Sequence, residues 1–261
     1  MSAIKCFLCL LLCMAMTAPP ALAETTGQEA AFRGWSEKKS YQYVSFGRYP
    51  ETDICEVKPL LWRVLATNEQ GEALLLTEYV IDMYPIIWVE DEKDREEHNF
   101  RAISDITESD LYTWMNSTMT ETMFTEEETT ALNAARGTLF LLNRTEYCTV
   151  DYGFTRSVYG KQTSRICSAT GYAKIRGVYQ ERGVKGTTYW LNDLSPGNPW
   201  RMSIVGMNGH ISYAGCARQN VGVRPACLVK MDRVSFTAGD GTKENPYVIS
   251  VKVSPAPESE Q

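Results

Sequence analysis

The residues best suited to chemistry in this chain are two late cysteines, Cys216 and Cys227. A cysteine attacks as its thiolate, which requires a cationic neighbour to lower the thiol pKa, and Arg218 is the nearest candidate along the chain. The same pair could close a disulfide, which would stabilise the fold by roughly 3 kcal/mol. Alternatively, both thiols are small buried hydrophobic groups, as free cysteines often are. The sequence leaves the bridge and the buried thiols equally open.

Other catalytic constellations are not found in the sequence. The two histidines, His98 and His210, lie far apart, whereas a catalytic zinc commonly takes three protein ligands. There is no Gly-x-Ser-x-Gly elbow and no glycine-rich phosphate loop before a helix. The acidic run 126–128 follows Thr125, and threonine with glutamate three residues later is the capping box that begins a helix. We therefore expect no catalytic residue and no metal ligand, and enzymatic activity is the weaker hypothesis.

Aromatic residues in and beside the long segment 145–200 favour recognition. Exposed rings next to amide and carboxylate groups are typical of sugar-binding or peptide-binding surfaces. Trp200 follows a Ser-Pro-Gly-Asn-Pro run, so we expect its ring to be exposed. The predicted ligand-binding residues are Trp200, Tyr179, Asn192, Asp193 and Arg201, and the further aromatic candidates are Tyr172, Tyr189, Trp190 and Tyr213.

The segment 145–186 is also rich in lysine and arginine, although the chain is acidic. Long loops of this kind are often functional or mobile. The favoured interpretation is nevertheless a solvated loop.

These candidates must be positioned by strands and by two helices. Asn-Glu-Gln-Gly (68–71) and Met-Asn-Gly-His (207–210) predict tight hairpin turns, and a loop is expected over 47–59. The charged run 90–97 is interpreted as a solvated face. Helical spacing predicts helices over Ser109–Met119 and 125–136, the second ended by Gly137. Apolar and alternating runs predict strands over 41–46, 60–67, 73–80, 138–142, 202–205, 211–214, 221–226, 228–236 and 247–253.

Arg224 is the unusual member of the strand 221–226, whose alternating residues predict two distinct faces. If that face is covered, the guanidinium must find a carboxylate or several carbonyls, because an unpaired buried charge is very unfavourable. We expect a structural role for Arg224 and also for Trp62, Trp114, Trp190 and Gly222.

Several motifs, taken in order, resemble a family of secreted bacterial domains of unknown function. That family is similar to the C-type-lectin-like superfamily, which includes the formylglycine-generating sulfatase-modifying enzymes. The motifs are Phe-Gly-Arg-Tyr-Pro (46–50), Leu-Trp-Arg-Val-Leu (61–65), Ala-Leu-Leu-Leu-Thr-Glu (73–78), Leu-Tyr-Thr-Trp-Met-Asn (111–116), Phe-Leu-Leu (140–142), Tyr-Trp-Leu (189–191) and Gly-Val-Arg-Pro-Ala (222–226), covering most of residues 43–229. The resemblance implies a C-type-lectin-like α+β fold, with a twisted, mostly antiparallel sheet, two helices and long loops. It does not supply a reaction, because that fold hosts both binders and enzymes.

The chemistry of the resembled proteins does not carry over residue by residue. The sulfatase-modifying enzymes bind copper through a closely spaced cysteine pair, and Cys216 and Cys227 are spaced more widely. Trp-Leu-Asn-Asp (190–193) and Glu-Asn-Pro (244–246) are similar to the calcium motifs of C-type lectins, but Glu-Asn-Pro comes after the closing strand. Calcium requires six or more oxygen ligands. We expect no cofactor, and calcium is the weaker alternative.

The N-terminal residues predict export. Lys5, the apolar run 6–16 and Ala-Leu-Ala (21–23) have the pattern of a secretory signal peptide over 1–23. A flexible leader over 24–34, one C-type-lectin-like domain over 35–253 and a disordered tail over 254–261 are expected to follow. Five cysteines lie beyond the predicted signal, so at least one would stay unpaired within the chain.

The net charge of −6 disfavours nucleic acid or an anionic membrane as a partner. Three function hypotheses follow. The first is a non-catalytic binding module for glycan or protein in the periplasm or outside the cell. The second is an enzyme on a formylglycine-generating scaffold. The third is a structural or assembly domain.

Overall fold

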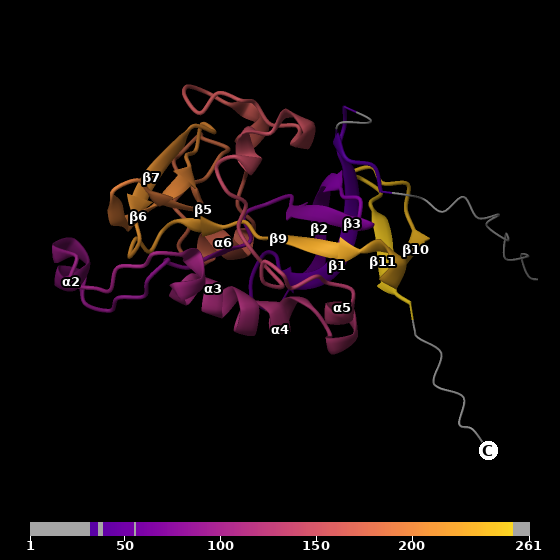
Figure 1. Cartoon of the computed structure of the whole chain (residues 1–261), viewed down its shortest axis with the longest axis horizontal. Helices are drawn as coiled ribbons and strands as arrows, with labels where there is room; N and C mark the ends of the chain where they lie inside the picture. Colours follow the sequence, from indigo (N-terminus) through magenta and orange to yellow (C-terminus); the bar gives the residue numbers. More distant parts are fainter. Residues whose placement is uncertain (1–31, 36–38, 55, 253–261) are drawn as a thin grey trace, which may run out of the picture. The chain divides into compact units, whose positions relative to one another are not determined.

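The computed structural model describes residues 32–35, 39–54 and 56–252, and these residues form two β-sheets (Figure 1). The six-stranded sheet has the order β10-β11-β1-β2-β3-β9, and the five-stranded sheet has the order β4-β8-β5-β6-β7. Adjacent strands are antiparallel except for the pairs β1–β11 and β5–β8. The fold is therefore α+β, with mostly antiparallel sheets and short helices. The predicted signal peptide, the tail and most of the leader lie outside the described residues.

The strands differ widely in length. Those of the larger sheet are β1 (Gln42–Pro50), β2 (Val57–Thr67), β3 (Glu72–Thr77), β9 (Ala226–Lys230), β10 (Val234–Ala238) and β11 (Tyr247–Val251). Those of the smaller sheet are β4 (Asp82–Met83), β5 (Tyr189–Ser195), β6 (Asn198–Val205), β7 (Ile211–Gly215) and β8 (Gly222–Val223).

The helices are short and mostly follow β4. The α-helices are α2 (Glu92–Glu97), α3 (Asp110–Trp114), α4 (Thr120–Met123), α5 (Glu126–Thr130) and α6 (Gly171–Ile175), and a π-helical turn, η2 (Met115–Met119), joins α3 to α4. The 3-10 turns are η1 (Ile106–Glu108), η3 (Glu146–Cys148), η4 (Val150–Tyr152), η5 (Thr163–Arg165) and η6 (Met231–Arg233). No helix within the described ranges is long and apolar enough to span a bilayer.

Both predicted hairpins are confirmed. In the β2–β3 turn, the Asn68 N–H donates to the Glu72 carbonyl at 2.9 Å, and Gly71 has a φ of +73°. In the β6–β7 turn, Gly209 has a φ of +83°. Positive φ is the conformation for which these turns select glycine.

The first predicted helix is longer than expected, and it closes one face of the larger sheet. Ser109 caps α3, and the helical path continues through η2 and α4. This path buries Met115, Met119 and Met123 in the same core as Trp62. Phe124, just after α4, stacks on the Trp62 ring with centroids 6.3 Å apart. Burying these side chains supplies the main apolar stabilisation of this layer.

The second predicted helix is wrong beyond its first turns. The capping box of Thr125 and Glu128 is present, but α5 ends at Thr130. The next residues pair with the edge of β9, because Asn133 N–H donates to Leu228 O and Phe140 exchanges hydrogen bonds with Ala226. Hydrogen bonds to the free edge of β9 therefore prevail over the helical propensity of this segment, as tertiary contacts commonly do. The strand predicted over 138–142 is reduced to a single bridge at Phe140.

The loop predicted over 47–59 is also wrong. β1 continues to Pro50 and β2 begins at Val57, so only six residues lie between the two strands. Lys58 forms ion pairs with Glu51 at 2.7 Å and with Glu56 at 2.9 Å across this connection.

The chain passes between the two sheets twice at the same place, through the β3–β4 and β8–β9 connections. Thr77 N–H donates to Pro225 O at 3.1 Å, and Ile81 N–H donates to Val223 O at 3.0 Å. The predicted strand 221–226 is thus divided between the sheets. Its residues are buried on both sides, so the expectation of two distinct faces was wrong.

The predicted leader, 24–34, extends too far. Phe32 is buried, and its ring centroid lies 4.8 Å from that of Phe236 in β10. Gly34 lies so close to the backbone of Ala66 that a side chain would not fit there. The domain therefore begins by Phe32 and not at Trp35, because these residues complete the core beneath β10 and β11.

The disulfide between Cys216 and Cys227 is not formed. Cys216 follows β7 in the smaller sheet, whereas Cys227 belongs to β9 in the larger one. Every described cysteine has a free thiol, namely Cys148, Cys167, Cys216 and Cys227, and Cys55 lies outside the described residues. Burial raises the pKa of the Cys216 thiol to about 12 and also raises that of Cys227. Both groups behave as buried apolar side chains.

Phe32→Ala is expected to lower the free energy of unfolding by about 3 kcal/mol, because it empties a buried aromatic site. Urea denaturation followed by tryptophan fluorescence measures the change. Ile54→Ala is the matched control, since Ile54 is 75% exposed and its loss should change little. Equal stability of the Phe32 variant and the parent protein would contradict the burial of Phe32.

Iodoacetamide at neutral pH should leave Cys216 and Cys227 unmodified in the folded protein, because both thiols are buried and protonated. After unfolding without reductant, both should be alkylated, as measured by peptide mass spectrometry. A disulfide-linked peptide containing both residues would show that the free-thiol assignment is incorrect.

Candidate functional site

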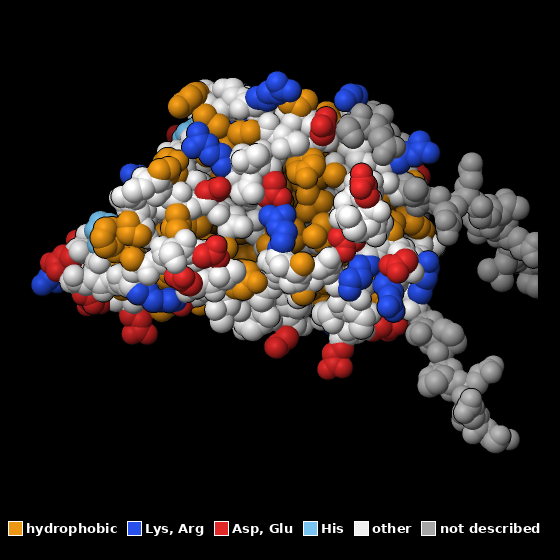
Figure 2. Space-filling model, viewed as in Figure 1, with side chains coloured by type: hydrophobic (Ala, Val, Ile, Leu, Met, Phe, Trp, Pro, Cys, Tyr) orange, Lys and Arg blue, Asp and Glu red, His pale blue; other side chains and the backbone are white. Residues whose placement is uncertain are grey.

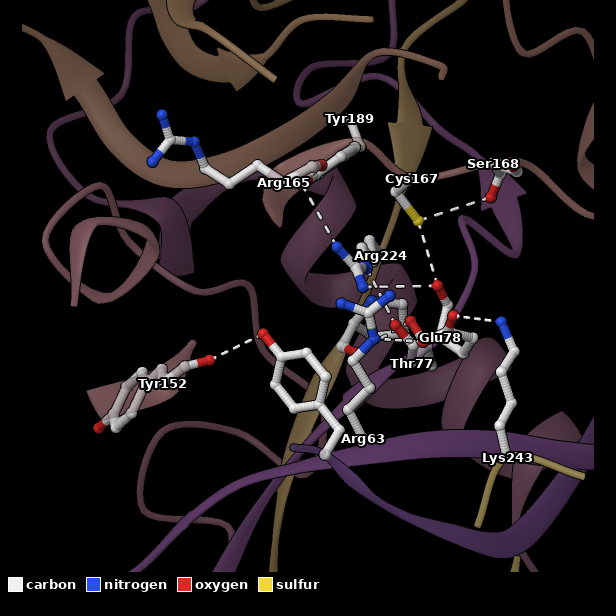
Figure 3. A network of polar contacts seen from close by, with 12 residues as sticks. Arg63, Thr77, Glu78, Tyr152, Arg165, Cys167, Ser168, Tyr189, Arg224 and Lys243 are labelled. Carbon is white, nitrogen blue, oxygen red and sulfur yellow. Dashed lines mark hydrogen bonds and ion pairs between the residues drawn. The ribbon is translucent and has the colours of Figure 1, made fainter. Parts of the chain in front are cut away.

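A buried guanidinium joins the two sheets where the chain crosses between them (Figure 3). Arg224 is 1% exposed, and its Nε donates to the Thr77 carbonyl at 2.9 Å. Its Nη2 donates to the Glu78 carbonyl at 3.4 Å, and its Nη1 donates to the Tyr189 hydroxyl at 3.3 Å. The burial anticipated for Arg224 is therefore present, and carbonyl oxygens serve as its acceptors.

The Glu78 side chain lies beside this guanidinium and binds two further cations. One carboxylate oxygen pairs with Arg63 Nε, and the other accepts from Lys243 Nζ at 2.7 Å. Burial alone would raise the pKa of Glu78, but hydrogen bonds and charge from Arg63 and Lys243 outweigh it and hold that pKa below its ordinary value. The carboxylate thus stays ionised and ties β2 and β3 to the loop before β11.

A second arginine is fully buried within the basic segment that was interpreted as a solvated loop. Arg165 donates to the carbonyls of Gly209 at 2.8 Å, Tyr147 at 2.9 Å and Thr155 at 2.7 Å, and also to Ser157. Its own carbonyl accepts from the Tyr189 hydroxyl at 2.7 Å. For this residue the solvated interpretation was wrong, because the guanidinium supplies the donors that an irregular buried backbone needs.

The Tyr84–Val89 segment after β4 crosses one end of the smaller sheet and is fixed by several hydrogen bonds, two of them to the sheet and its β7 end. The Trp190 indole N–H donates to the Tyr84 carbonyl at 2.9 Å. The Ile87 N–H donates to the Cys216 carbonyl at 3.0 Å. This fixed backbone holds the side chain of Trp88 at the surface, where it is 50% exposed.

Three rings form what we call the aromatic platform, namely Tyr84, Trp88 and Trp114. The Tyr84 ring stacks on Trp114 with centroids 4.6 Å apart and an interplanar angle of 10°. Trp88 packs against Tyr84 at a tilt of 40°, with centroids 5.6 Å apart. Aromatic pairs at such separations gain about 1 kcal/mol beyond the area they bury, so the rings support one another. Trp114 is half-buried and packs against the core, so it supports the platform from beneath while part of its ring remains accessible.

Charged groups border the aromatic platform. Asp110 accepts from the Trp88 N–H at 2.8 Å and forms an ion pair with Arg101. Burial raises the pKa of Tyr84, with Asp110 adding to the rise and Arg176 opposing it. The tyrosine hydroxyl is therefore protonated at neutral pH, with a carboxylate and a guanidinium acting on it.

Trp200 lies near the same end of the smaller sheet and is 37% exposed, as predicted. Its carbonyl accepts from the Cys216 N–H at 2.8 Å, so Cys216 lies between the backbones of Trp200 and Ile87. The His98 ring, just after α2, approaches the Trp200 ring edge-on at 6.2 Å. Hydrophobic side chains accordingly reach the surface at this end, beside the acidic side chains along the edge of α2, α4 and α5 (Figure 2).

The other predicted ligand-binding residues fall into separate surroundings. Tyr179 is 44% exposed and donates its N–H to the Asn220 carbonyl. Asp193 accepts from the Arg144 N–H at 2.5 Å, and burial raises the pKa of its carboxyl. Arg201 donates to the Tyr213 carbonyl at 3.0 Å, and Arg144 donates to the Tyr213 hydroxyl, so one chain of contacts runs from Asp193 to Arg201.

Asn192 lines a small cavity of about 180 Å³ with Arg136 and Tyr112. The Arg136 guanidinium is already occupied by Glu146, which it meets at 2.7 and 3.0 Å. Of the further aromatic candidates, Tyr189 and Trp190 are fully buried in β5 and do not reach the surface, whereas Tyr172 and Tyr213 are half-buried.

Trp88 and Tyr84 were not selected from the sequence. They precede the charged run 90–97, in which α2 (Glu92–Glu97) has no buried residues. The signal in the sequence was an aromatic-rich stretch that contains Pro85. Proline disfavours a continuous helix or strand, so the rings beside it lie in an irregular segment.

A further buried ionisable group is held by contacts within the protein. Asp82 is 1% exposed and accepts from Tyr49 Oη at 2.6 Å and Arg176 Nε at 3.1 Å. Burial raises the pKa of Asp82 despite these partners. Within the described ranges no three histidine, cysteine or acidic side chains lie together as a metal site would require.

Comparison with known proteins found no match among family models, curated proteins or solved structures.

Glu78→Gln should lower the free energy of unfolding at pH 7 by about 3 kcal/mol, because Arg63 would lose its carboxylate partner. The folded pKa of Glu78 is lowered, so its stabilisation is present above the unfolded pKa, about 4.3, and is lost as the pH falls through the folded value. The difference between parent and variant should therefore shrink below about pH 4. Denaturant titrations at several pH values measure it, with exposed Glu127→Gln as the control. A difference independent of pH would contradict the pairing.

Proposed function

We propose that the protein is a non-catalytic, extracytoplasmic binding module whose ligand is a glycan, held at the aromatic platform. The observation that carries the proposal is the ring cluster of Trp114, Tyr84 and Trp88, in which Tyr84 stacks on Trp114 and Trp88 packs at a tilt against Tyr84 with half of its surface exposed. A fixed ring offers a flat apolar face at little conformational cost, and sugars present apolar C–H faces that can lie against it.

The polar groups around the platform suit the same ligand class. Sugar hydroxyls both donate and accept hydrogen bonds, and Asp110 with Arg101 supplies acceptors and donors at the border of the rings. A mostly apolar surface with a few convergent polar groups is the usual composition of a small-ligand site. Trp200, at the same end of the sheet, would extend the contact to further sugar units.

Catalysis is the less favoured alternative. An enzyme on a formylglycine-generating scaffold would need a reactive thiol, and burial raises the pKa of Cys216, Cys227 and Cys167. A low-pKa, accessible thiolate is what such chemistry requires. The export that the N-terminal sequence predicts places the glycan in the periplasm or outside the cell.

We also propose that the fold is C-type-lectin-like. Support comes from the order of the sequence motifs and from the pairing of the first and last strands, β1 and β11. The long, irregular insert between β4 and β5 is a further shared feature. No calcium site is proposed.

Trp88→Ala should weaken glycan binding roughly 30-fold, equivalent to about 2 kcal/mol, because a central tryptophan commonly dominates a binding surface. Ligands would be identified on a glycan array and the affinities measured by titration calorimetry. Trp200→Ala should have a smaller effect. Tyr159→Ala is the matched control, since Tyr159 is 79% exposed and belongs to no described ring cluster.

Thermal unfolding of each variant would show that the fold is retained. Absence of saturable binding to any glycan, or an equal loss of glycan affinity in the Trp88 and Tyr159 variants, would contradict the proposal. Binding to a protein surface that needs Trp88 would instead identify a protein partner as the ligand and overturn the glycan assignment.

A further inference from the structure

A second concave site lies between the loop 181–186 and the tip of the β6–β7 hairpin. It is a groove of about 740 Å³, lined on one side by Glu181 and residues 183–186 and on the other by Met207, Asn208 and His210. None of the rings of the aromatic platform lines it. Its volume falls within the roughly 300–1,000 Å³ typical of small-molecule sites.

Close backbone contacts fix the walls of this groove. A side chain on Gly186 would collide with the Met207 carbonyl, and a side chain on Gly209 would collide with the Gln162 carbonyl. Gln162 N–H also donates to the Asn208 carbonyl at 2.8 Å. Glycine permits such an approach because it has no Cβ. The loop and the hairpin tip are therefore held against each other.

The buried guanidinium of Arg165 anchors the hairpin wall of the groove from inside. It donates to the Gly209 carbonyl at the hairpin tip and to carbonyls of the segment that precedes the groove, at Thr155 and Ser157. Because these donors leave little freedom to the backbone, the hairpin wall is preformed. A preformed site avoids part of the ordering entropy that binding otherwise requires.

The side chains of the groove combine an apolar floor with a cationic rim. Ile166, Val184 and Met207 contribute apolar surface, and Val184 is 37% exposed. Lys161 and Lys185 are exposed at the rim, and neither ammonium group forms an ion pair with a described residue. Glu181 is the one carboxylate among the lining residues. A local excess of positive charge therefore lies on a chain whose net charge is −6.

We propose that this groove binds a small organic anion with an apolar body and a single carboxylate, sulfate or phosphate group. The apolar body lies against Val184 and Met207, and the anionic group pairs with Lys161 and Lys185. A lysine ammonium group is a compact point charge without the planar fork of arginine. The site therefore discriminates between ligands by their negative charge and apolar body more than by the geometry of the anionic group.

The test uses naphthalene-1-sulfonate as the anionic probe and naphthalene-1-methanol as its neutral counterpart, with titration calorimetry on the whole protein. The parent protein should bind the sulfonate saturably and at least about tenfold more tightly than the neutral probe, and the preference should shrink at high salt. Lys161→Glu with Lys185→Glu should weaken sulfonate binding about tenfold or more and leave the neutral probe unaffected.

Two matched variants separate the rim from the floor. Lys174→Glu, at an exposed lysine of α6 outside the groove, should leave both probes unaffected. Val184→Ser should weaken both probes, because it removes apolar surface from the floor. Trp88→Ala should not alter sulfonate binding, which keeps this site distinct from the glycan surface. The proposal is overturned if the sulfonate does not saturate, if both probes bind equally, or if Lys174→Glu weakens the sulfonate as much as the double variant does.

Discussion

A guanidinium cannot stay buried without acceptors, and the acceptors that satisfy Arg224 are the carbonyls at which the chain leaves the larger sheet. This requirement binds the β8–β9 connection to the β3–β4 connection and so sets how the two sheets meet. Glu78 lies in the same connection, and its carboxylate holds Arg63 of β2 and Lys243 before β11. One polar centre thus joins segments from the beginning and the end of the domain.

The buried guanidinium of Arg165 also needs acceptors. It stabilises irregular backbone, whereas Arg224 stabilises the junction of the two sheets. Loops without regular structure leave carbonyls that need donors, and a single guanidinium can supply several of them. Tyr189 connects the two arginines, because its hydroxyl accepts from Arg224 and donates to the Arg165 carbonyl. The long insert between β4 and β5 is therefore anchored through side chains. The same arginine holds the hairpin tip that forms one wall of the proposed groove.

The two proposed sites use different parts of this framework. The aromatic platform depends on a segment fixed across the end of the smaller sheet by Trp190 and Cys216. The cationic groove depends on the hairpin tip that Arg165 anchors. Since neither site shares a side chain with the other, a ligand at one need not displace a ligand at the other. The platform offers ring faces, whereas the groove offers charge above an apolar floor.

The sequence by itself determined the features that depend on neighbouring residues. The hairpin turns at Gly71 and Gly209, the capping box at Thr125 and the exposure of Trp200 follow from local chemistry, and so does the α+β class with mostly antiparallel strands. Only the tertiary structure decided that helix α5 ends at Thr130, that Cys216 and Cys227 lie in different sheets, and that Arg165 is buried. Each of these depends on a partner distant in sequence: the edge of β9, the division of strands between two sheets, and carbonyls from several loops. Hydrophobic periodicity indicates which face of an element is apolar. It does not indicate which backbone N–H and C=O groups will pair with a distant part of the chain.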